Sequence, residues 1–391
     1  MLKTVFTKVV TAIAVGAALE VALVDTQPAQ AANLSFDTDK PIPLILDDDG
    51  SQDGLIALAY MLQNPKFSVE AITISHGLAY PQQFGDNMMR ALVRLGVTGI
   101  PVGVGSEVPL AGNNTFPELF RGDSVKFYSP FVPPLTETAL ETVDDRDAAQ
   151  LIIDTIKQSP DPVTILSTGS LTNIAEALRR DPSIVNNVAA LEIMGGAVFV
   201  DGNLGVHTDP VLANNEVAEF NIWLDPVATQ EVFSSGLPVF LTPLDATNKI
   251  EFTRADQYAW EAVGTPESLL AAGLLDFSLT VVSNSENPNP IWDLVAAINL
   301  SEASFCNEVP LHLKVDTDSA PGETQGQTLA VNGLPPNVNV CLNPSFNNVS
   351  FNSREVFSHK DVPEPSTILA TLAFGSLFAL LKRQRASEKK G

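Results

Sequence analysis

Four carboxylates lie within seven residues near the start of the chain, directly after a short apolar run that predicts a buried strand. These acidic residues are Asp47, Asp48, Asp49 and Asp53. Open α/β sheets bind ligands at the carboxyl ends of their strands, and clustered aspartate oxygens suit a hard cation such as Ca²⁺ or Mg²⁺. We therefore interpret this loop as the core of a metal site. In the simpler alternative, a polar turn, Ser51 or Asp53 caps the following helix, but a cap uses only one carboxylate.

The elements that must position this loop alternate along the chain between short apolar runs and segments of helical periodicity. The expected strands are 43–46, 69–75, 102–104, 163–167, 191–194 and 239–242. The expected helices are 51–63, 82–95, 147–158, 171–180, 225–234 and 254–260. This alternation predicts an α/β fold with a mainly parallel, open sheet and helices on both faces. Two stretches rich in Pro and Asn, 111–134 and 316–348, are expected to be long loops.

The first residues follow the pattern of a secretory signal peptide. Lys3 and Lys8 precede a largely apolar stretch, and an A-x-A cleavage pattern is centred on Ala29 and Ala31. We expect residues 1–31 to be removed and the protein to be exported to the cell envelope or the extracellular space.

The last residues resemble the PEP-CTERM sorting tail of bacterial envelope proteins. Residues 363–391 contain a Pro-Glu-Pro triplet, an apolar run over 367–381 and a basic end. The resemblance implies a sorting protease as a partner and transient membrane association of this segment. The apolar run is shorter than the ~20 residues of a comfortable transmembrane helix, which favours a processed signal over a permanent anchor.

Composition limits the remaining choices. The chain has 46 acidic and 22 basic residues, and its net charge of −24 would repel a phosphate backbone, so we expect no nucleic-acid partner. The two cysteines, Cys306 and Cys341, could pair in an oxidising compartment, although the sequence does not show whether they lie close enough. Two distant cysteines and four scattered histidines form no zinc-binding pattern.

Ordered motifs beyond the acidic loop point to one family. They are LDDDGSQDGLIAL at 46–58, ILSTGSLTNIA at 165–175, MGG at 194–196, GN at 202–203, AEFNIWLDP at 218–226 and IWDLVAA at 291–297. With these motifs the chain resembles the inosine–uridine-preferring nucleoside hydrolase family over about residues 42–357. The resemblance implies that residues 32–362 form a catalytic domain, which hydrolyses the N-glycosidic bond of ribonucleosides to free base and ribose. A homo-oligomer is compatible with this prediction.

The same resemblance assigns roles to individual residues. It implies that Ca²⁺ is bound by Asp49, the main-chain carbonyl of Thr168 and Asp293, and that Asp49 also takes the proton from the attacking water. Asp53 is a further metal candidate and matches a position that holds the sugar hydroxyls. The other substrate candidates that the resemblance implies are Met194, Asn203, Glu219, Phe220, Asn221 and Trp292.

Two positions depart from the family pattern. The family loop ends in two adjacent aspartates, whereas here Gly54 follows Asp53, so either Asp53 or Asp48 has to supply the missing ligand or the site binds calcium weakly. Some members carry a histidine proton donor before the last metal aspartate, where this chain has Trp292. Purine-preferring relatives have tryptophan there, which implies a purine preference. His76 and His207 are the alternative proton donors.

Two other readings compete with this hydrolase. The strand followed by D-x-D-G-S also fits a phosphatase of the haloacid dehalogenase type, in which Asp47 would be the nucleophile, Asp49 the acid and base, and Mg²⁺ the metal. The second reading is a degenerate hydrolase fold that survives as a binding protein of the envelope, for which Gly54 is an argument.

Overall fold

The computed structural model describes residues 40–118, 120–121, 142–205, 212–282, 291–345 and 357. The strands are β1 Ile42–Asp48, β2 Phe67–Ile74, β3 Val102–Val104, β4 Val163–Ser167, β5 Val188–Met194, β6 Val239–Thr242, β7 Cys306–Leu311, β8 Leu313–Val315, β9 Thr328–Ala330 and β10 Val338–Pro344. The α-helices are α1 Gln52–Gln63, α2 Pro81–Leu95, α4 Ala148–Gln158, α5 Thr172–Arg180, α6 Phe220–Leu224, α7 Pro226–Phe233, α8 Leu244–Thr247, α9 Arg254–Val263, α10 Pro266–Phe277 and α11 Trp292–Ser301. Three short helical segments are η1 Pro182–Asn187, η2 Leu212–Asn214 and η3 Ser278–Val282.

Eight strands form one sheet in the order β3-β2-β1-β4-β5-β6-β10-β7. Every neighbouring pair is parallel except β10 and β7, which places one antiparallel strand at the edge. The predicted α/β fold is thereby confirmed. The chain leaves β1 toward β2 on one side, and β4 pairs with β1 on the other side, so the strand order reverses between β1 and β4. Such a reversal opens a crevice at the carboxyl ends of the two strands.

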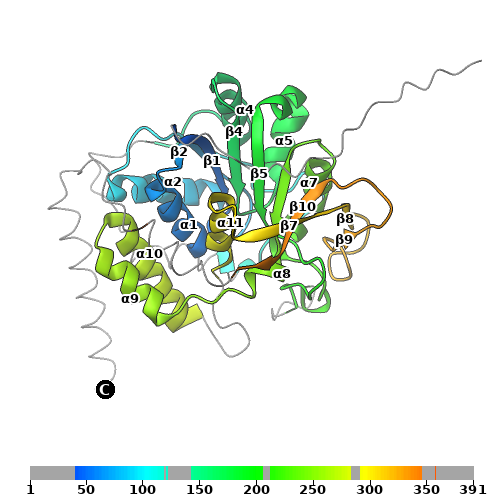
Figure 1. The fold of residues 1–391 in the computed structure, drawn as a ribbon. Helices are drawn as coiled ribbons and strands as arrows, with labels where there is room; N and C mark the ends of the chain where they lie inside the picture. Colours follow the sequence, from blue (N-terminus) through cyan, green and yellow to red (C-terminus); the bar gives the residue numbers. More distant parts are fainter. Residues whose placement is uncertain are drawn as a thin grey trace, which may run out of the picture.

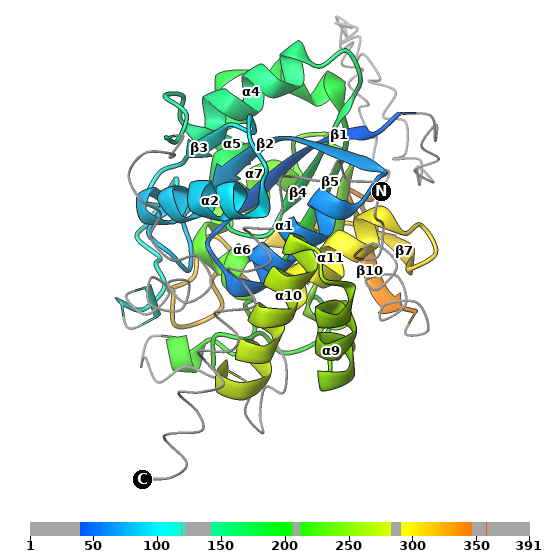
Figure 2. The same ribbon diagram turned by 90° about the vertical axis from the view of Figure 1, so that its left-hand side faces the viewer.

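Helices cover both faces of the sheet, as Figures 1 and 2 show. Alternate residues of β1 enter two different cores, because successive side chains of a strand point to opposite faces. Leu44 and Leu46 pack with α1, α2, α9, α10 and α11, whereas Ile45 packs with α4, α5 and α7. The continuous apolar run before the acidic loop is therefore explained by a central strand that is buried on both sides.

The C-terminal part differs from the prediction. The expected loop over 316–348 contains β9 and β10, and β10 lies inside the sheet between β6 and β7. The prediction was wrong here because Asn339, Asn343 and Pro344 lie within β10 itself, and these residue types are typical of loops. Helix α10 was also missed, although Thr265 caps it and Pro266 opens it, both ordinary start signals. Of the other expected loop, residues 122–134 lie outside the described residues.

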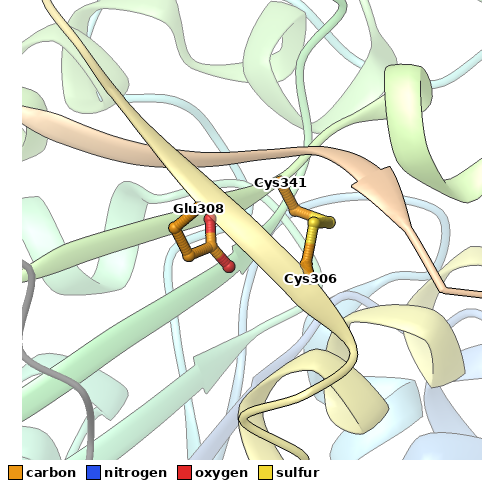
Figure 3. A group of neighbouring side chains, drawn as sticks. All are labelled: Cys306, Glu308 and Cys341. Carbon is orange, nitrogen blue, oxygen red and sulfur yellow. A yellow bond between two sulfur atoms is a disulfide. The ribbon is translucent and has the colours of Figure 1, made fainter.

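A disulfide joins Cys306 of β7 to Cys341 of β10, with the two Cα atoms 5.7 Å apart. Figure 3 shows this bond between the two strands and the carboxylate of Glu308 beside it. The pairing that the sequence left open is therefore present. Both sulfurs are bonded to each other, so neither is a thiolate that could bind a metal together with Glu308.

The predicted targeting segments, 1–31 and 363–391, lie outside the described residues. Within the described ranges, no helix combines the length and the apolar character that crossing a bilayer would require.

Candidate active site

The acidic loop lies at the reversal of strand order between β1 and β4. Asp48 ends β1 and Asp49 follows it, and Thr168 directly follows Ser167, the last residue of β4. The backbone N–H of Thr168 donates to the carbonyl oxygen of Asp47 at 2.8 Å, which aligns the ends of the two strands. The loop and the Thr168 turn therefore meet at the crevice that the topology predicts.

Asp49 has one oxygen without a hydrogen-bond partner. Its Oδ2 accepts the backbone N–H of Leu78 at 3.1 Å, whereas its Oδ1 is buried and unpartnered. Burial raises the pKa of Asp49 well above the usual range, and the negative charges of Asp48, Asp53 and Glu219 raise it further. A buried carboxylate oxygen with no donor is costly, so this atom indicates a missing positive partner.

Asp53 and Asp293 meet at the first turn of α11. The Oδ2 atom of Asp53 accepts the backbone N–H groups of Trp292 at 2.9 Å and Asp293 at 3.2 Å. These N–H groups have no partner inside their own helix, and the positive end of the helix dipole favours the carboxylate. The Ser51 hydroxyl caps α1 by accepting from Gly54 N at 2.8 Å, as one of the two predicted caps, and donates to Asp293 Oδ2 at 2.6 Å.

Asp48 is fully buried between the same elements. Its Oδ1 accepts from Gly50 N at 2.9 Å and its Oδ2 accepts from the Thr168 hydroxyl at 2.9 Å. Burial raises the pKa of Asp48 to about 7, against the lowering effect of both hydrogen bonds. The charge of Asp48 in turn raises the pKa values of Asp49 and Asp293.

The donor set of this cluster fits a hard metal cation. None of the Lys and Arg side chains in the described ranges forms an ion pair with its four carboxylates, Asp48, Asp49, Asp53 and Asp293. Buried like charges without a cation repel each other and favour protonation. Oxygen ligands alone, without thiolate or imidazole, are what Ca²⁺ and Mg²⁺ prefer.

Three predicted substrate residues surround the Thr168 turn. The Asn221 amide donates to the carbonyl oxygens of Met194 at 3.1 Å and Thr168 at 3.4 Å. Glu219 caps α6 by accepting the backbone N–H groups of Asn221 and Ile222, and it also accepts Gly196 N at 2.9 Å. The end of β5 and the start of α6 are therefore held against the carboxylate cluster.

The remaining substrate candidates line the adjoining region. Asn203 Oδ1 accepts the backbone N–H of Phe220 at 3.0 Å, and the Phe220 ring stacks on Phe116 with centroids 4.1 Å apart. Phe220 is buried in a small core with Trp223, so its ring serves packing. Trp292 is partly buried at the start of α11, beside the Asp53 carboxylate, and its indole N–H donates to Asn248 at 3.1 Å.

The arrangement matches known proteins. Residues 44–350 match the family described as inosine-uridine preferring nucleoside hydrolase. A pyrimidine-specific ribonucleoside hydrolase RihA of Escherichia coli is 37% identical over 308 residues, which are 77% of this chain and 93% of that protein. The corresponding RihA of Salmonella arizonae is 33% identical over the same coverage.

The chain belongs to the inosine–uridine-preferring nucleoside hydrolase family. It is thus a ribonucleoside hydrolase of a metal-dependent family. Two solved structures share its fold, a purine-preferring ribonucleoside hydrolase from Gardnerella vaginalis and an inosine-uridine preferring nucleoside hydrolase from Bacillus anthracis. Each superposes with a TM-score of 0.67 at 23% identity and covers 81% of this chain and 99% of its own.

Membership in the nucleoside hydrolase family overturns the phosphatase alternative, and the geometry gives the physical reason. Asp47 would be the nucleophile of a phosphatase, but it is fully buried and points to the opposite face from Asp48. Its carboxylate accepts hydrogen bonds from Thr73, Ser167 and Asn173. Both oxygens of this buried carboxylate are held by donors, two on Oδ1 and one on Oδ2, so neither is available to attack a substrate.

Of the two histidine candidates for the proton donor, the structure describes His76, which forms no hydrogen bond with the carboxylate cluster. His76 is buried and its Nε2 lies 2.8 Å from the carbonyl oxygen of Asn114. Burial and the charge of Arg121 lower the pKa of His76 to about 4, so its ring is neutral at physiological pH. His207 lies outside the described residues.

Sequence reasoning missed several contacts that hold the site. It assigned no role to Leu78, whose backbone N–H binds Asp49, and it did not foresee that Ser51 links α1 to Asp293. It also gave Asn173 no part, although this side chain fixes Asp47 from α5. The T-N-I-A motif is the one signal that could have drawn attention to Asn173. The backbone donor of Leu78 leaves no signal in a sequence.

Proposed function

We propose that this hydrolase is an exported, calcium-dependent enzyme that cleaves the N-glycosidic bond of ribonucleosides, with a preference for purines, to give free base and ribose. One observation carries the proposal. Four buried carboxylates lie at the crevice beside the Thr168 turn, none of the Lys and Arg side chains in the described ranges pairs with them, and one oxygen of Asp49 has no partner. A calcium ion would satisfy this oxygen and neutralise the cluster.

Asp49 is the residue with the properties of the general base. Its unpartnered Oδ1 can accept a proton from water, and its other oxygen is fixed by Leu78 N. When bound, calcium supplies a positive charge that lowers the pKa of water and offsets the repulsion that raises the pKa of Asp49. Departure of the base leaves an oxocarbenium-like sugar, and the negative charges of the cluster suit that developing positive charge.

The sugar side of the site is assigned to polar groups that the fold already orients. Asn221 is fixed between Met194 and the Thr168 turn, and Asn203 is held against the start of α6. Asp53 is fixed by the backbone of α11 through one oxygen. We assign these three side chains to the ribose hydroxyls, because preset groups lose little freedom when a substrate binds.

The preference among bases depends on Trp292. Its backbone N–H binds Asp53 of the cluster, and its partly buried indole donates to Asn248, so we assign the ring to stacking on the base that leaves the ribose. The RihA relatives are named pyrimidine-specific, whereas the Gardnerella vaginalis protein is named purine-preferring. Trp292 favours a purine substrate, since the two-ring purine base offers more surface for stacking on the indole than the single ring of a pyrimidine does.

Export rests on the two terminal patterns, and the disulfide supports it. Cys306–Cys341 bonds of this kind persist in oxidising compartments such as the bacterial envelope. We expect the mature protein from its native cells to lack residues 1–31, through signal peptidase, and the region beyond Pro363, through a sorting protease that meets the tail at the membrane. An intact-mass measurement that finds both termini would refute export and sorting.

The enzymatic proposal is tested with a panel of nucleosides. Purified protein is incubated with inosine, guanosine, uridine and cytidine, with calcium or with excess chelator, and release of reducing sugar is followed. We expect calcium-dependent turnover with the highest kcat/KM for a purine nucleoside. The Asp49→Asn protein is the matched control for contaminating activity. Equal turnover in chelator would remove the calcium requirement, and binding of nucleosides without turnover would favour the envelope binding protein.

A further inference from the structure

The Asp48 carboxylate occupies the place of a side chain that Gly54 lacks. A Cβ atom added to Gly54 would lie 1.7 Å from Asp48 Oδ2 and 2.7 Å from Asp48 Cγ. Contacts this short do not occur, so Asp48 in its present position and any side chain at residue 54 exclude each other. Gly54 has no positive φ that would require glycine, which leaves the space for Asp48 as the physical reason for this residue.

Hydrogen bonding alone does not explain an aspartate at position 48. The side chain accepts one bond from Gly50 N and one from the Thr168 hydroxyl. An asparagine could make both contacts, because its carbonyl oxygen accepts from the backbone and its amide can donate to the hydroxyl. The Asp48 carboxylate is fully buried with two neutral donors, and none of the Lys and Arg side chains in the described ranges forms an ion pair with it. A buried charge without a positive partner is costly.

A second observation shows where that charge is directed. The unpartnered Oδ1 belongs to Asp49, the residue that directly follows Asp48, and Asp49 is 97% buried. Asp48 also faces the side of the sheet that carries α1 and α11, because Leu44 and Leu46 face that side and side chains alternate. Its carboxylate therefore lies on the same side as Asp53 and Asp293.

We infer that Asp48 is a ligand of the proposed calcium ion, and that Asp48 and Gly54 form an interdependent pair in which the strand supplies the carboxylate and the helix leaves room for it. This inference rests on the proposed calcium site and deepens it. In this pair the last ligand of the ion comes from the end of β1 rather than from the start of α1. The pair thereby explains how the loop retains four carboxylates although glycine follows Asp53.

The test measures calcium binding rather than turnover. CaCl₂ is titrated into the full mature chain by calorimetry, and melting curves are recorded with and without CaCl₂. Asp48→Asn should weaken calcium binding at least about tenfold, since even indirect supports of metal ligands cost roughly 10–100-fold, while the metal-free protein keeps or gains thermal stability. Asp47→Asn is the matched control, because it removes one charge from the adjacent residue on the opposite face.

The pair is tested by exchanging the two residues. Gly54→Asp alone should lower the melting temperature of the metal-free protein, because its side chain collides with Asp48. Asp48→Thr alone should weaken calcium binding, and Asp48→Thr combined with Gly54→Asp should bind calcium more tightly than Asp48→Thr. With Eu³⁺ as a luminescent substitute, Asp48→Asn should increase the number of water molecules on the ion.

The outcomes separate this inference from the proposed function. If the wild-type protein binds no calcium, both fail. If the wild type binds calcium and Asp48→Asn matches the wild type or the Asp47→Asn control, Asp48 is not a ligand although the calcium site stands. If Asp48→Asn weakens binding but the exchanged protein is no better than Asp48→Thr, or does not fold, the interdependence of the pair is refuted.

Discussion

Two groups of buried carboxylates lie in this hydrolase, and their surroundings differ. The first is the cluster of Asp48, Asp49, Asp53 and Asp293 at the crevice. The second is Glu192 of β5 with the partly buried Glu308 of β7, and Figure 3 shows Glu308 next to the disulfide. Burial raises the pKa of Glu308 to about 7 and that of Glu192 well above its usual range.

The second group is supplied with neutral donors. The Asn299 amide donates to Glu308 at 2.9 Å and to both oxygens of Glu192, and the Thr242 hydroxyl also donates to Glu192. The crevice carboxylates also accept bonds from neutral donors, but four of them lie together there, and the charges of three of them raise the pKa of the fourth, Asp293. The comparison teaches that raised pKa values alone do not mark a functional site. Glu308 Oε2, like Asp49 Oδ1, is buried without a partner, so the two groups differ in the number of carboxylates and in their position relative to the crevice rather than in a single oxygen.

The largest effect is expected at Asp49, where the comparison is most direct. Asp49→Asn removes the charge and the proton acceptor at the crevice, so hydrolysis should fall by at least ~10²-fold. The melting temperature should stay the same or rise, since a buried repulsion is removed. Steady-state kinetics with a circular dichroism melt check both points. Near-normal turnover in this variant would remove Asp49 from the mechanism.

A smaller loss of activity is expected when Trp292, whose backbone N–H binds Asp53 of the crevice cluster, is replaced. Stacking on an aromatic ring is worth ~1–3 kcal/mol per base, so Trp292→Ala should lower kcat/KM for inosine about tenfold or more. The loss for uridine should be smaller, because its ring offers less surface. Trp292→Phe, which keeps an aromatic face, is the control. Equal losses for both nucleosides with an unchanged melting curve would show that Trp292 does not recognise the base.

The disulfide beside the second group should affect stability and leave catalysis unchanged. It spans a sequence separation of 35 residues, and a crosslink over about 35 residues stabilises by roughly 3–4 kcal/mol in the chain-entropy model. The Cys306→Ser/Cys341→Ser protein should therefore melt roughly 5–10 °C lower, with unchanged kcat/KM at 25 °C. A large loss of activity in protein that is still folded would contradict this prediction, because it would show that the region of the disulfide influences catalysis at the crevice.

The smallest effect is a change in stability on Glu308→Gln, which replaces a carboxylate of the second group by an amide as Asp49→Asn does in the crevice. The folded-state pKa of about 7 lies above the usual glutamate value of 4.5, so the folded protein retains this proton to higher pH than the unfolded chain. Wild-type stability therefore declines as pH rises from 4.5 through 7. Glu308→Gln should be more stable than wild type at pH 8, by roughly 1–2 kcal/mol, and equal to it at pH 4. A gain of the same size at both pH values would contradict the titration of Glu308 beside Glu192.

The two groups also show what a sequence can and cannot reveal. The crevice was predictable because its acidic residues are adjacent in the chain, and because β1 and β4 consist of short apolar runs of ordinary type. The second group was not, since Glu192, Asn299 and Glu308 come from three distant elements and no motif connects them. The role of Asp48 remained one of two alternatives, because only the packing of α1 against β1 shows that Gly54 has space for one carboxylate.

Helix α11 connects the two groups. Asp293 lies in its first turn and Asn299 in its last, and the residues between them pack against α1 and β5. Helical hydrogen bonds form and break cooperatively, and amide hydrogens exchange with solvent only when such a unit opens. An opening that releases Asp293 from the crevice also withdraws Asn299 from the buried glutamates, so exchange at α11 reports on both groups at once, and occupancy of the crevice should slow exchange even at the far end of the helix.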